Sequence, residues 1–251
     1  MKKLLMIWGL FGLLACQTQE KERNNQVSSI PEATAEEPIV IDRGPIEFNG
    51  LIDVQSLNDQ IYCELKYASE DNFMGFQLYK SIKRPYLQPD VAERLSKCQD
   101  YLTEIDSSLH LLIYDAARPV SVQRLMWEGL DTISPGLRAK YVCNPKYRSL
   151  HNVGAAVDIT ICNEEGIAMD MGARFDEFAE IAYPRMEAHF LKTGALSQGQ
   201  YQNRLLLRRV MRSQGFRQLP TEWWHYNAFS RNEALSKFKA LMEEPDSLTN
   251  H

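Results

Sequence analysis

Two short segments of the sequence place histidines and carboxylates at spacings that suit chemistry on a metal ion. In residues 149–158, His151 lies seven residues before Asp158, with Gly154 and two alanines between them. Such small residues let the backbone and a ligand approach each other closely. The second segment, Glu222-Trp223-Trp224-His225, pairs another carboxylate with another imidazole, beside two aromatic rings that can exclude water.

These four groups predict a catalytic zinc site. Three protein ligands and one open position are typical of catalytic zinc, which lowers the pKa of its bound water to about 7. Side chains three apart on an ideal strand point to opposite faces, so Glu222 and His225 converge only across a bulge or a turn. Asp158 is expected in the middle of a strand, a rigid place for a ligand. We therefore assign His151, Asp158 and His225 to the metal and Glu222 to acid/base chemistry on the water.

The other two histidines in the predicted elements are expected to be structural. His110 lies in a predicted strand and His189 in a predicted helix, and neither has a carboxylate motif around it. His151 and His225 differ because each has its own flanking carboxylate.

The elements that must position these groups follow from the hydrophobic pattern. Pro89 and apolar residues at intervals of three and four predict an amphipathic helix over residues 89–106. The apolar run 109–114 predicts a buried strand whose end delivers Asp115 and Arg118 to a surface. The pattern also predicts helices over residues 120–130, 175–191, 200–214 and 231–243, and strands over residues 155–161 and 216–227.

This irregular alternation favours an α+β fold: a single domain with a central, mainly antiparallel sheet, flanking helices and the zinc site at the sheet. The chain has 251 residues, of which 44% are hydrophobic and 24% charged, which excludes collagen-like, wholly disordered and multi-span membrane proteins. The formal charge is −5, or −7 without Lys2 and Lys3. A negative charge argues against a nucleic-acid partner, because binding phosphates needs a basic surface.

The amino terminus is typical of an export signal. Lys2 and Lys3 precede an apolar stretch of 12 residues, and a polar run follows Cys16. The stretch is shorter than the about 20 residues of a membrane-spanning helix. Leu13-Leu14-Ala15-Cys16 resembles a bacterial lipobox, which implies that Cys16 is lipidated; the alternative is an ordinary secretory signal with a chance cysteine.

We therefore expect three regions: a lipoprotein signal peptide over residues 1–15, lipidated Cys16 with a flexible tether over residues 16–45, and one catalytic domain over residues 46–251. The tether is polar and almost free of aromatic residues, so it cannot bury enough surface to order itself. The protein would be an exported bacterial lipoprotein, anchored in a membrane and facing the periplasm or cell envelope.

Five blocks of the sequence resemble the D-alanyl-D-alanine dipeptidases of the VanX type. They span roughly residues 50 to 230 and occur in the family's order. The blocks are Lys66-Tyr67-Ala68 with Asp71-Asn72-Phe73-x-Gly75, Tyr114-Asp115-Ala116-Ala117-Arg118-Pro119, Ser149-x-His151-x-x-Gly154-x-Ala156-x-Asp158, Met171-Gly172-Ala173-Arg174-Phe175-Asp176, and Glu222-Trp223-Trp224-His225.

The resemblance implies a role for each matching residue. It implies one zinc ion on His151, Asp158 and His225, with Glu222 as the catalytic base and Arg118 stabilising the charge that develops on the former carbonyl oxygen. It also implies that three residues hold the free amino terminus of the substrate and so limit the enzyme to dipeptides: Tyr67, Ser149 and Asp176.

Alternative roles remain open for three of these polar residues. Arg118 could be a surface arginine after a strand, and Asp115 could either orient it or cap the next turn. Asp176 could be the N-cap of a following helix.

The implied activity is hydrolysis of D-alanyl-D-alanine to two D-alanine molecules, in peptidoglycan-related metabolism. A zinc D,D-carboxypeptidase or endopeptidase acting on peptidoglycan stem peptides is one alternative. A non-catalytic lipoprotein that binds the cell wall is another, but such a protein would need neither Glu222 nor Arg118. The sequence does not specify an oligomeric state.

Cysteine usage gives one further expectation. With Cys16 lipidated, an even set remains: Cys63, Cys98, Cys143 and Cys162. Four cysteines in an oxidising compartment allow two disulfides in three pairings, or none. Cys143 and Cys162 flank the zinc segment, and a bridge between them would fasten its loop to its strand.

Overall fold

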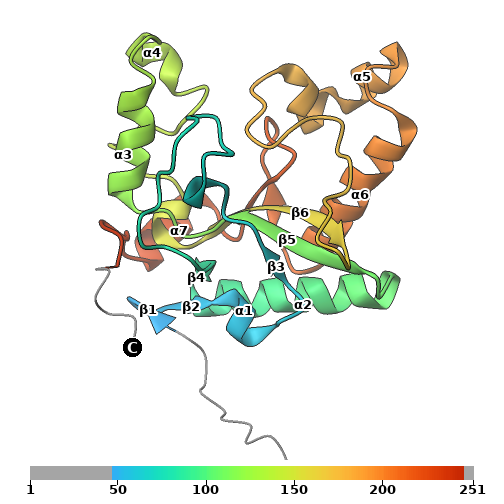
Figure 1. Cartoon of the computed structure of the whole chain (residues 1–251), viewed down its shortest axis with the longest axis horizontal. Helices are drawn as coiled ribbons and strands as arrows, with labels where there is room; N and C mark the ends of the chain where they lie inside the picture. Colours follow the sequence, from blue (N-terminus) through green and yellow to red (C-terminus); the bar gives the residue numbers. More distant parts are fainter. Residues whose placement is uncertain (1–46, 246–251) are drawn as a thin grey trace, which may run out of the picture. The chain divides into compact units, whose positions relative to one another are not determined.

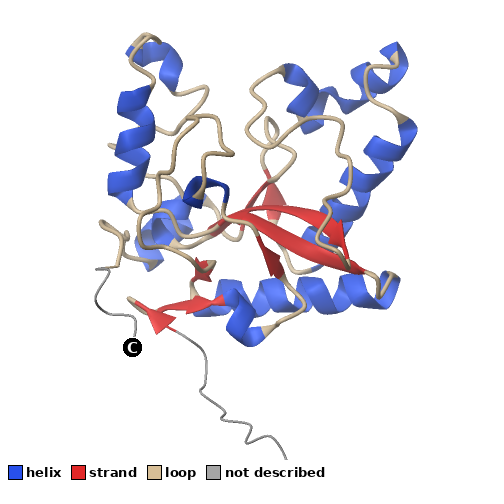
Figure 2. Ribbon diagram, viewed as in Figure 1, coloured by secondary structure: helices blue, strands red, loops and turns tan. Residues whose placement is uncertain are grey.

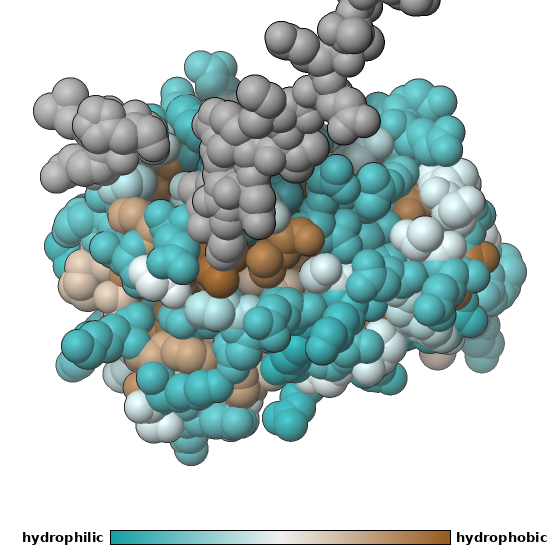
Figure 3. Space-filling model, turned by 90° about the horizontal axis from the view of Figure 1, so that it is seen from below, coloured by the Kyte–Doolittle hydropathy of each residue, from teal (hydrophilic) through white to brown (hydrophobic). Residues whose placement is uncertain are grey.

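The computed structural model describes residues 47–245. The predicted signal peptide, lipidated Cys16 and tether therefore lie outside the described residues. Within residues 47–245, no helix has both the length and the apolar character needed to cross a membrane. Polar side chains cover most of the face drawn in Figure 3, and apolar ones gather there in smaller patches.

A five-stranded sheet forms the centre of the fold, with strand order β3-β5-β6-β8-β7 (Figures 1 and 2). The strands are β3 (Tyr62–Cys63), β5 (Leu109–Asp115), β6 (Ala156–Asn163), β7 (Arg217–Gln218) and β8 (His225–Asn227). Only β3 and β5 run parallel, and the other neighbours are antiparallel. The predicted α+β fold with a mainly antiparallel central sheet is confirmed.

A second, three-stranded antiparallel sheet has the order β1-β2-β4. Its strands are β1 (Glu47–Phe48), β2 (Leu51–Asp53) and β4 (Tyr86–Leu87).

Seven α-helices lie in the described part of the chain. They are α1 (Val54–Leu57), α2 (Pro89–Ile105), α3 (Val120–Gly129), α4 (Pro135–Arg138), α5 (Glu187–Thr193), α6 (Gln198–Ser213) and α7 (Arg231–Lys237). Figure 1 shows α3 and α4 on one side of the central sheet and α5 and α6 on the other. The predicted strand over 109–114 and the predicted helices over 89–106, 120–130 and 200–214 each match an observed element within one or two residues.

The largest apolar core lies where α2 and α6 pack against the central sheet. Pro89 at the start of α2 fixes a helical φ, and Val91, Leu95, Cys98 and Leu102 form its buried face. Helix α6 begins with a capping box, in which Ser197 and Gln200 satisfy each other's backbone N–H groups. The two helices thus pack against β5 and β6 and hold these strands in place.

The helix predicted over residues 175–191 is wrong in its first half. The chain runs as a loop up to residue 179, continues through two short 3-10 turns (Glu180–Ala182 and Pro184–Met186), and becomes α-helical only at Glu187. Pro184 disfavours helical backbone in the residue before it, which interrupts the expected pattern.

The strand predicted over residues 216–227 is a hairpin of two short strands, β7 and β8. Pro220 lies in the connecting turn, and Gln218 reaches across that turn, donating from Nε2 to the Trp223 carbonyl at 2.7 Å. The turn places Glu222 outside the pleat of β8, as its spacing from His225 requires.

The last predicted helix, residues 231–243, ends at Lys237, and an extended tail follows. The Leu241 carbonyl accepts from the N–H of Val120 at 2.9 Å, and the N–H of Leu241 donates to the Asn152 carbonyl at 2.7 Å. The Glu244 carboxylate accepts from the backbone N–H groups of residues 80–82 at 2.7–3.1 Å. These pairings with distant segments replace the hydrogen bonds that a longer helix would have made.

All four cysteines among the described residues are free. The bridge suggested between Cys143 and Cys162 is wrong, because Cys143 is exposed on a loop whereas Cys162 is buried within β6.

Gly154 is required by the turn that leads from the first histidine segment into β6. Its φ is +64°, and a Cβ there would lie 2.8 Å from Leu51 Cδ2 and 3.2 Å from the backbone nitrogen of Gln88. We expect Gly154→Ala to lower the free energy of unfolding by at least about 2 kcal/mol, through left-handed backbone and overpacking. Denaturant unfolding measures this. Gly136→Ala is the control: a Cβ there meets nothing within 4 Å, so a similar loss would contradict the explanation.

Candidate active site

Neighbouring strands of the central sheet bring the predicted metal ligands together. Asp158 on β6 lies opposite His225 on β8, and His151 comes from a 3-10 turn (His151–Val153) just before β6. His151 Nε2 lies 3.1 Å from His225 Nδ1 and 3.3 Å from Asp158 Oδ1, and His225 Nδ1 lies 2.9 Å from the same oxygen. All three side chains are buried.

The other ring nitrogen of each histidine already has an acceptor. His151 Nδ1 lies 2.7 Å from the Ala116 carbonyl, which can only accept, so this nitrogen carries the proton. His225 Nε2 lies 2.9 Å from Asn227 Oδ1, which fixes its proton in the same way. With their outer nitrogens occupied in this way, the rings direct their other nitrogens toward each other and toward Asp158. Three acceptors this close repel one another unless a cation lies between them.

The donor set fits a zinc ion. Zinc bonds of about 2.0–2.2 Å at tetrahedral angles hold ligand atoms about 3.3 Å apart, and the distances here are 2.9–3.3 Å. Two imidazole nitrogens and one carboxylate oxygen are ligands that zinc accepts.

Glu222 lies beside this group without belonging to it. Its Oε2 is 3.8 Å from His225 Nδ1, and its side chain is 32% exposed. Burial among protein atoms raises the pKa of the Glu222 carboxyl, and the charge of Asp158 raises it further, against the opposing effect of His225. A carboxyl with a raised pKa is suited to taking up and returning a proton near neutral pH.

Arg118 is buried rather than on the surface, and Asp115 orients it. Arg118 Nε and Nη2 donate to Asp115 Oδ2 at 2.9 and 2.6 Å, and Nη2 lies 3.5 Å from Asp158 Oδ2. The Tyr79 hydroxyl donates to the other oxygen of Asp115 at 2.5 Å. The guanidinium also stacks 4.8 Å from the centroid of the Tyr67 ring. The surface and turn-capping alternatives are therefore wrong.

The three residues expected to bind a substrate amino group lie in the same cavity. The Tyr67 hydroxyl donates to both oxygens of Asp176, at 3.0 and 3.2 Å. Ser149 Oγ accepts from the N–H of His151 at 3.3 Å. Asp176 does not cap a helix; its φ is +57°, and it lies in the loop before the 3-10 turns. Burial raises the pKa of its carboxyl well above the usual value, and the charge of Asp158 adds to this.

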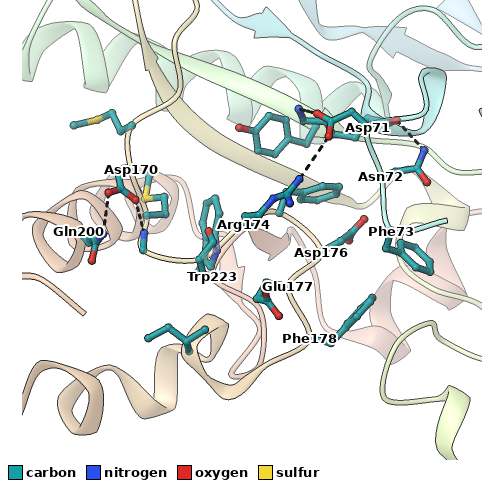
Figure 4. Close-up of a pocket in the computed structure, with 18 residues that line it drawn as sticks. Asp71, Asn72, Phe73, Asp170, Arg174, Asp176, Glu177, Phe178, Gln200 and Trp223 are labelled. Atoms are coloured by element: carbon teal, nitrogen blue, oxygen red, sulfur yellow. Dashed lines mark hydrogen bonds and ion pairs between the residues drawn. The ribbon is translucent and has the colours of Figure 1, made fainter. Parts of the chain in front are cut away.

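Two adjoining cavities surround these residues. The cavity at the candidate metal ligands has a volume of about 340 Å³ and contains Trp224 in its wall. The outer cavity has a volume of about 950 Å³ and is drawn in Figure 4. Asp176 and Phe178 line both, so the loop that carries them separates the two. In Figure 4, Arg174 reaches from this loop toward Asp71, with 3.9 Å between their charged atoms.

The two tryptophans lie on different sides of this boundary. Trp224 is buried in the wall of the metal cavity, with its ring 5.5 Å from that of Phe175. Trp223 lines the outer cavity and donates from Nε1 to the Ala173 carbonyl at 3.1 Å, which ties down the loop before Asp176.

Sequence reasoning missed three contacts that hold the site: the Ala116 carbonyl on His151, Asn227 on His225, and Tyr79 on Asp115. The contact between Asn227 and His225 could have been predicted from the sequence, because residues two apart on a strand share a face. Tyr79 lies 36 residues before Asp115, and nothing local in the sequence connects the two.

This fold and site define the class of zinc metallopeptidases. A model of the Peptidase M15 family, described as D-Ala-D-Ala dipeptidase, matches residues 47–239, and the chain belongs to this family. The resemblance found in the sequence is thereby confirmed.

Individual relatives agree with this assignment. The D-alanyl-D-alanine dipeptidase of Escherichia coli K12 is 34% identical over 176 residues, which cover 70% of this chain and 83% of the relative. The enzyme of the same name from Enterococcus faecalis is 28% identical over 193 residues, covering 71% and 91%. Among solved structures, VanYB in complex with D-alanine-D-alanine matches at 14% identity and a TM-score of 0.34, covering 62% of this chain and 78% of VanYB. A structural similarity this distant carries no conclusion about the site.

Proposed function

We propose that the protein is a zinc-dependent dipeptidase that hydrolyses D-alanyl-D-alanine to two D-alanine molecules. The observation that carries the proposal is the convergence of three lone pairs, on His151, Asp158 and His225, within 3.3 Å of one another. The proposed substrate is the one named for the relatives from Escherichia coli and Enterococcus faecalis, D-alanyl-D-alanine. When bound, zinc supplies Lewis acidity and makes water a nucleophile near neutral pH.

The chain's own residues would do the rest of the chemistry. Glu222 accepts a proton from the attacking water and returns it to the nitrogen of the leaving D-alanine when the peptide C–N bond breaks. Arg118, held by Asp115, faces the carbonyl oxygen on which negative charge develops. Asp176 and Tyr67 bind the ammonium group at the other end of the dipeptide, with Ser149 in the wall of the same cavity.

A comparison of two substrates tests this function. The purified full chain, loaded with zinc, is assayed for D-alanine release from D-alanyl-D-alanine and from a longer, amino-blocked peptide with the same end. We expect much the higher kcat/KM for the free dipeptide, because the blocked peptide offers Asp176 no ammonium group. A higher kcat/KM for the blocked peptide would favour the carboxypeptidase alternative. No hydrolysis of either by zinc-loaded protein would overturn the proposal.

Asn227 provides a test of the zinc site that does not depend on turnover. The acceptor on His225 Nε2 keeps the ligating nitrogen free of a proton, so Asn227→Ala is expected to weaken zinc binding by about 10- to 100-fold. Competition with a chromophoric chelator measures the affinity. Asn227→Asp keeps an oxygen acceptor and should bind zinc nearly as well as the unaltered protein. Equal affinity for all three proteins would remove Asn227 from this role.

We also propose that the chain is an exported lipoprotein, lipidated at Cys16 and anchored in a membrane. Support comes from the sequence alone: two lysines, an apolar stretch and the Leu-Leu-Ala-Cys end. Mass spectrometry of the mature amino terminus, with Cys16→Ser for comparison, tests this. An unmodified Cys16 in mature protein would overturn it.

A further inference from the structure

The cavity at the candidate metal ligands contains one charged side chain that the proposed function leaves unused, that of Arg231. Among its described lining residues, five carry formal charges besides the histidines: Arg118, Asp158, Asp176, Glu222 and Arg231. Asp158 is assigned to the metal and Glu222 to proton transfer. Arg118 is neutralised by Asp115, at 2.6 Å, and lies 3.5 Å from Asp158.

Asp176 and Arg231 have no such partners. Of the ion pairs within 4.0 Å among residues 47–245, none includes either residue. Asp176 accepts only from the neutral Tyr67 hydroxyl. The cavity thus contains one carboxyl group and one guanidinium that form no ion pair within 4.0 Å in the described part of the chain.

Arg231 is an exposed residue in the lining of the cavity, and two backbone carbonyls hold its guanidinium there. It is the first residue of α7, and its Nη1 donates to the Arg148 carbonyl at 2.7 Å. Its Nη2 donates to the Tyr147 carbonyl. Both carbonyls belong to the loop that leads directly into Ser149 and His151. The Cys143 thiol is a further hydrogen-bond partner of Arg231. These neutral partners fix the direction of the guanidinium without cancelling its charge, and its remaining N–H groups can bind a ligand.

A free dipeptide is a zwitterion, with an ammonium at one end and a carboxylate at the other. Extended, its charged ends lie roughly 7 Å apart, as two residues span about 3.3–3.6 Å each. A cavity of about 340 Å³ with one unpaired charge of each sign matches such a molecule. The ammonium would meet Asp176, which leaves the carboxylate to the cation without a partner.

We propose that Arg231 binds the free C-terminal carboxylate of the substrate and so makes the enzyme specific for peptides that end at the residue to be released. This inference rests on the proposed function and adds a residue that binds the second charged end of the dipeptide. We do not assign the substrate carboxylate to Arg118, because Arg118 already forms ion pairs with Asp115 and Asp158.

The test compares D-alanyl-D-alanine with D-alanyl-D-alaninamide, which has the same scissile bond but no C-terminal charge. Release of D-alanine from each substrate is measured with the zinc-loaded full chain, and the ratio of the two kcat/KM values is formed. We expect the unaltered protein to prefer the acid, and Arg231→Gln to lower that ratio at least about tenfold, mainly through KM for the acid. Arg231→Lys should keep part of the preference.

The ratio separates charge recognition from damage to the fold, because misfolding or zinc loss lowers both rates together. Ser230→Ala is the matched control: it removes the side chain that caps α7 next to Arg231 but keeps the charge. Its ratio should equal that of the unaltered protein. The proposal fails if Arg231→Gln keeps the original ratio, or if Ser230→Ala changes the ratio as much. An unaltered, zinc-loaded protein that cleaves neither substrate would instead refute the proposed function, and this inference with it.

Discussion

Glu222→Gln is expected to bind zinc as the unaltered protein does and to lose turnover of D-alanyl-D-alanine by about 10²- to 10⁴-fold, the usual contribution of a positioned acid/base. Glutamine has nearly the same shape as glutamate but cannot accept a proton from water. Glu222 lies 3.8 Å from His225 Nδ1 but outside the set of three acceptors, so its charge is not needed to hold the metal.

The measurement is kcat with bound zinc determined in the same sample. Glu165→Gln serves as the control, because it removes an exposed carboxylate that lines neither of the two cavities. Hydrolysis by Glu222→Gln at the unaltered rate would refute the assignment of the base. A loss of zinc together with activity would show that Glu222 acts as a ligand instead.

His151→Ala is expected to abolish both zinc retention and hydrolysis. The substitution removes one of three ligands and leaves Asp158 and His225, which do not complete a catalytic zinc site. Ligands that bind only the folded state stabilise it, so zinc should raise the melting temperature of the unaltered protein and leave that of His151→Ala unchanged.

Metal content by elemental analysis and thermal unfolding with and without zinc check this result. His189→Ala is the control, because His189 is exposed on α5 and has no part in the cluster of acceptors. Stoichiometric zinc in His151→Ala, with the usual stabilisation, would rule out His151 as a ligand.

The sequence predicted contacts between residues that are close together in the chain better than contacts between distant residues. His151 and Asp158 belong to one turn and one strand, so their spacing alone brought them together. His225 was placed beside them by the antiparallel register of β6 and β8, a pairing that the sequence resemblance implied but no local pattern showed. The placement of Asp158 within a strand was predicted correctly, as was the need for a bulge or turn between Glu222 and His225. The strand predicted over residues 216–227 wrongly included Glu222, which lies in the turn between β7 and β8.

The errors occurred where distant segments override local preference. Residues 175–179 have a helix-like pattern, yet Trp223 Nε1 holds the preceding Ala173 and Tyr67 holds Asp176 in a loop. Residues 238–243 also read as a helix, but their backbone pairs with Val120 and Asn152 instead. Such contacts join residues 50 to 121 positions apart, which no short window of sequence contains.

The tail after α7 also determines at which point in its synthesis the enzyme can become active. Synthesis proceeds from the amino terminus, so every residue of the site is added to the chain before Leu241 and Glu244. Until then the Asn152 carbonyl beside His151, the first turn of α3 beyond Arg118 and the backbone of residues 80–82 lack their partners. The site is therefore completed only once Leu241 and Glu244 are present, and a chain that stops between His225 and Leu241 contains every proposed catalytic side chain without these supporting contacts.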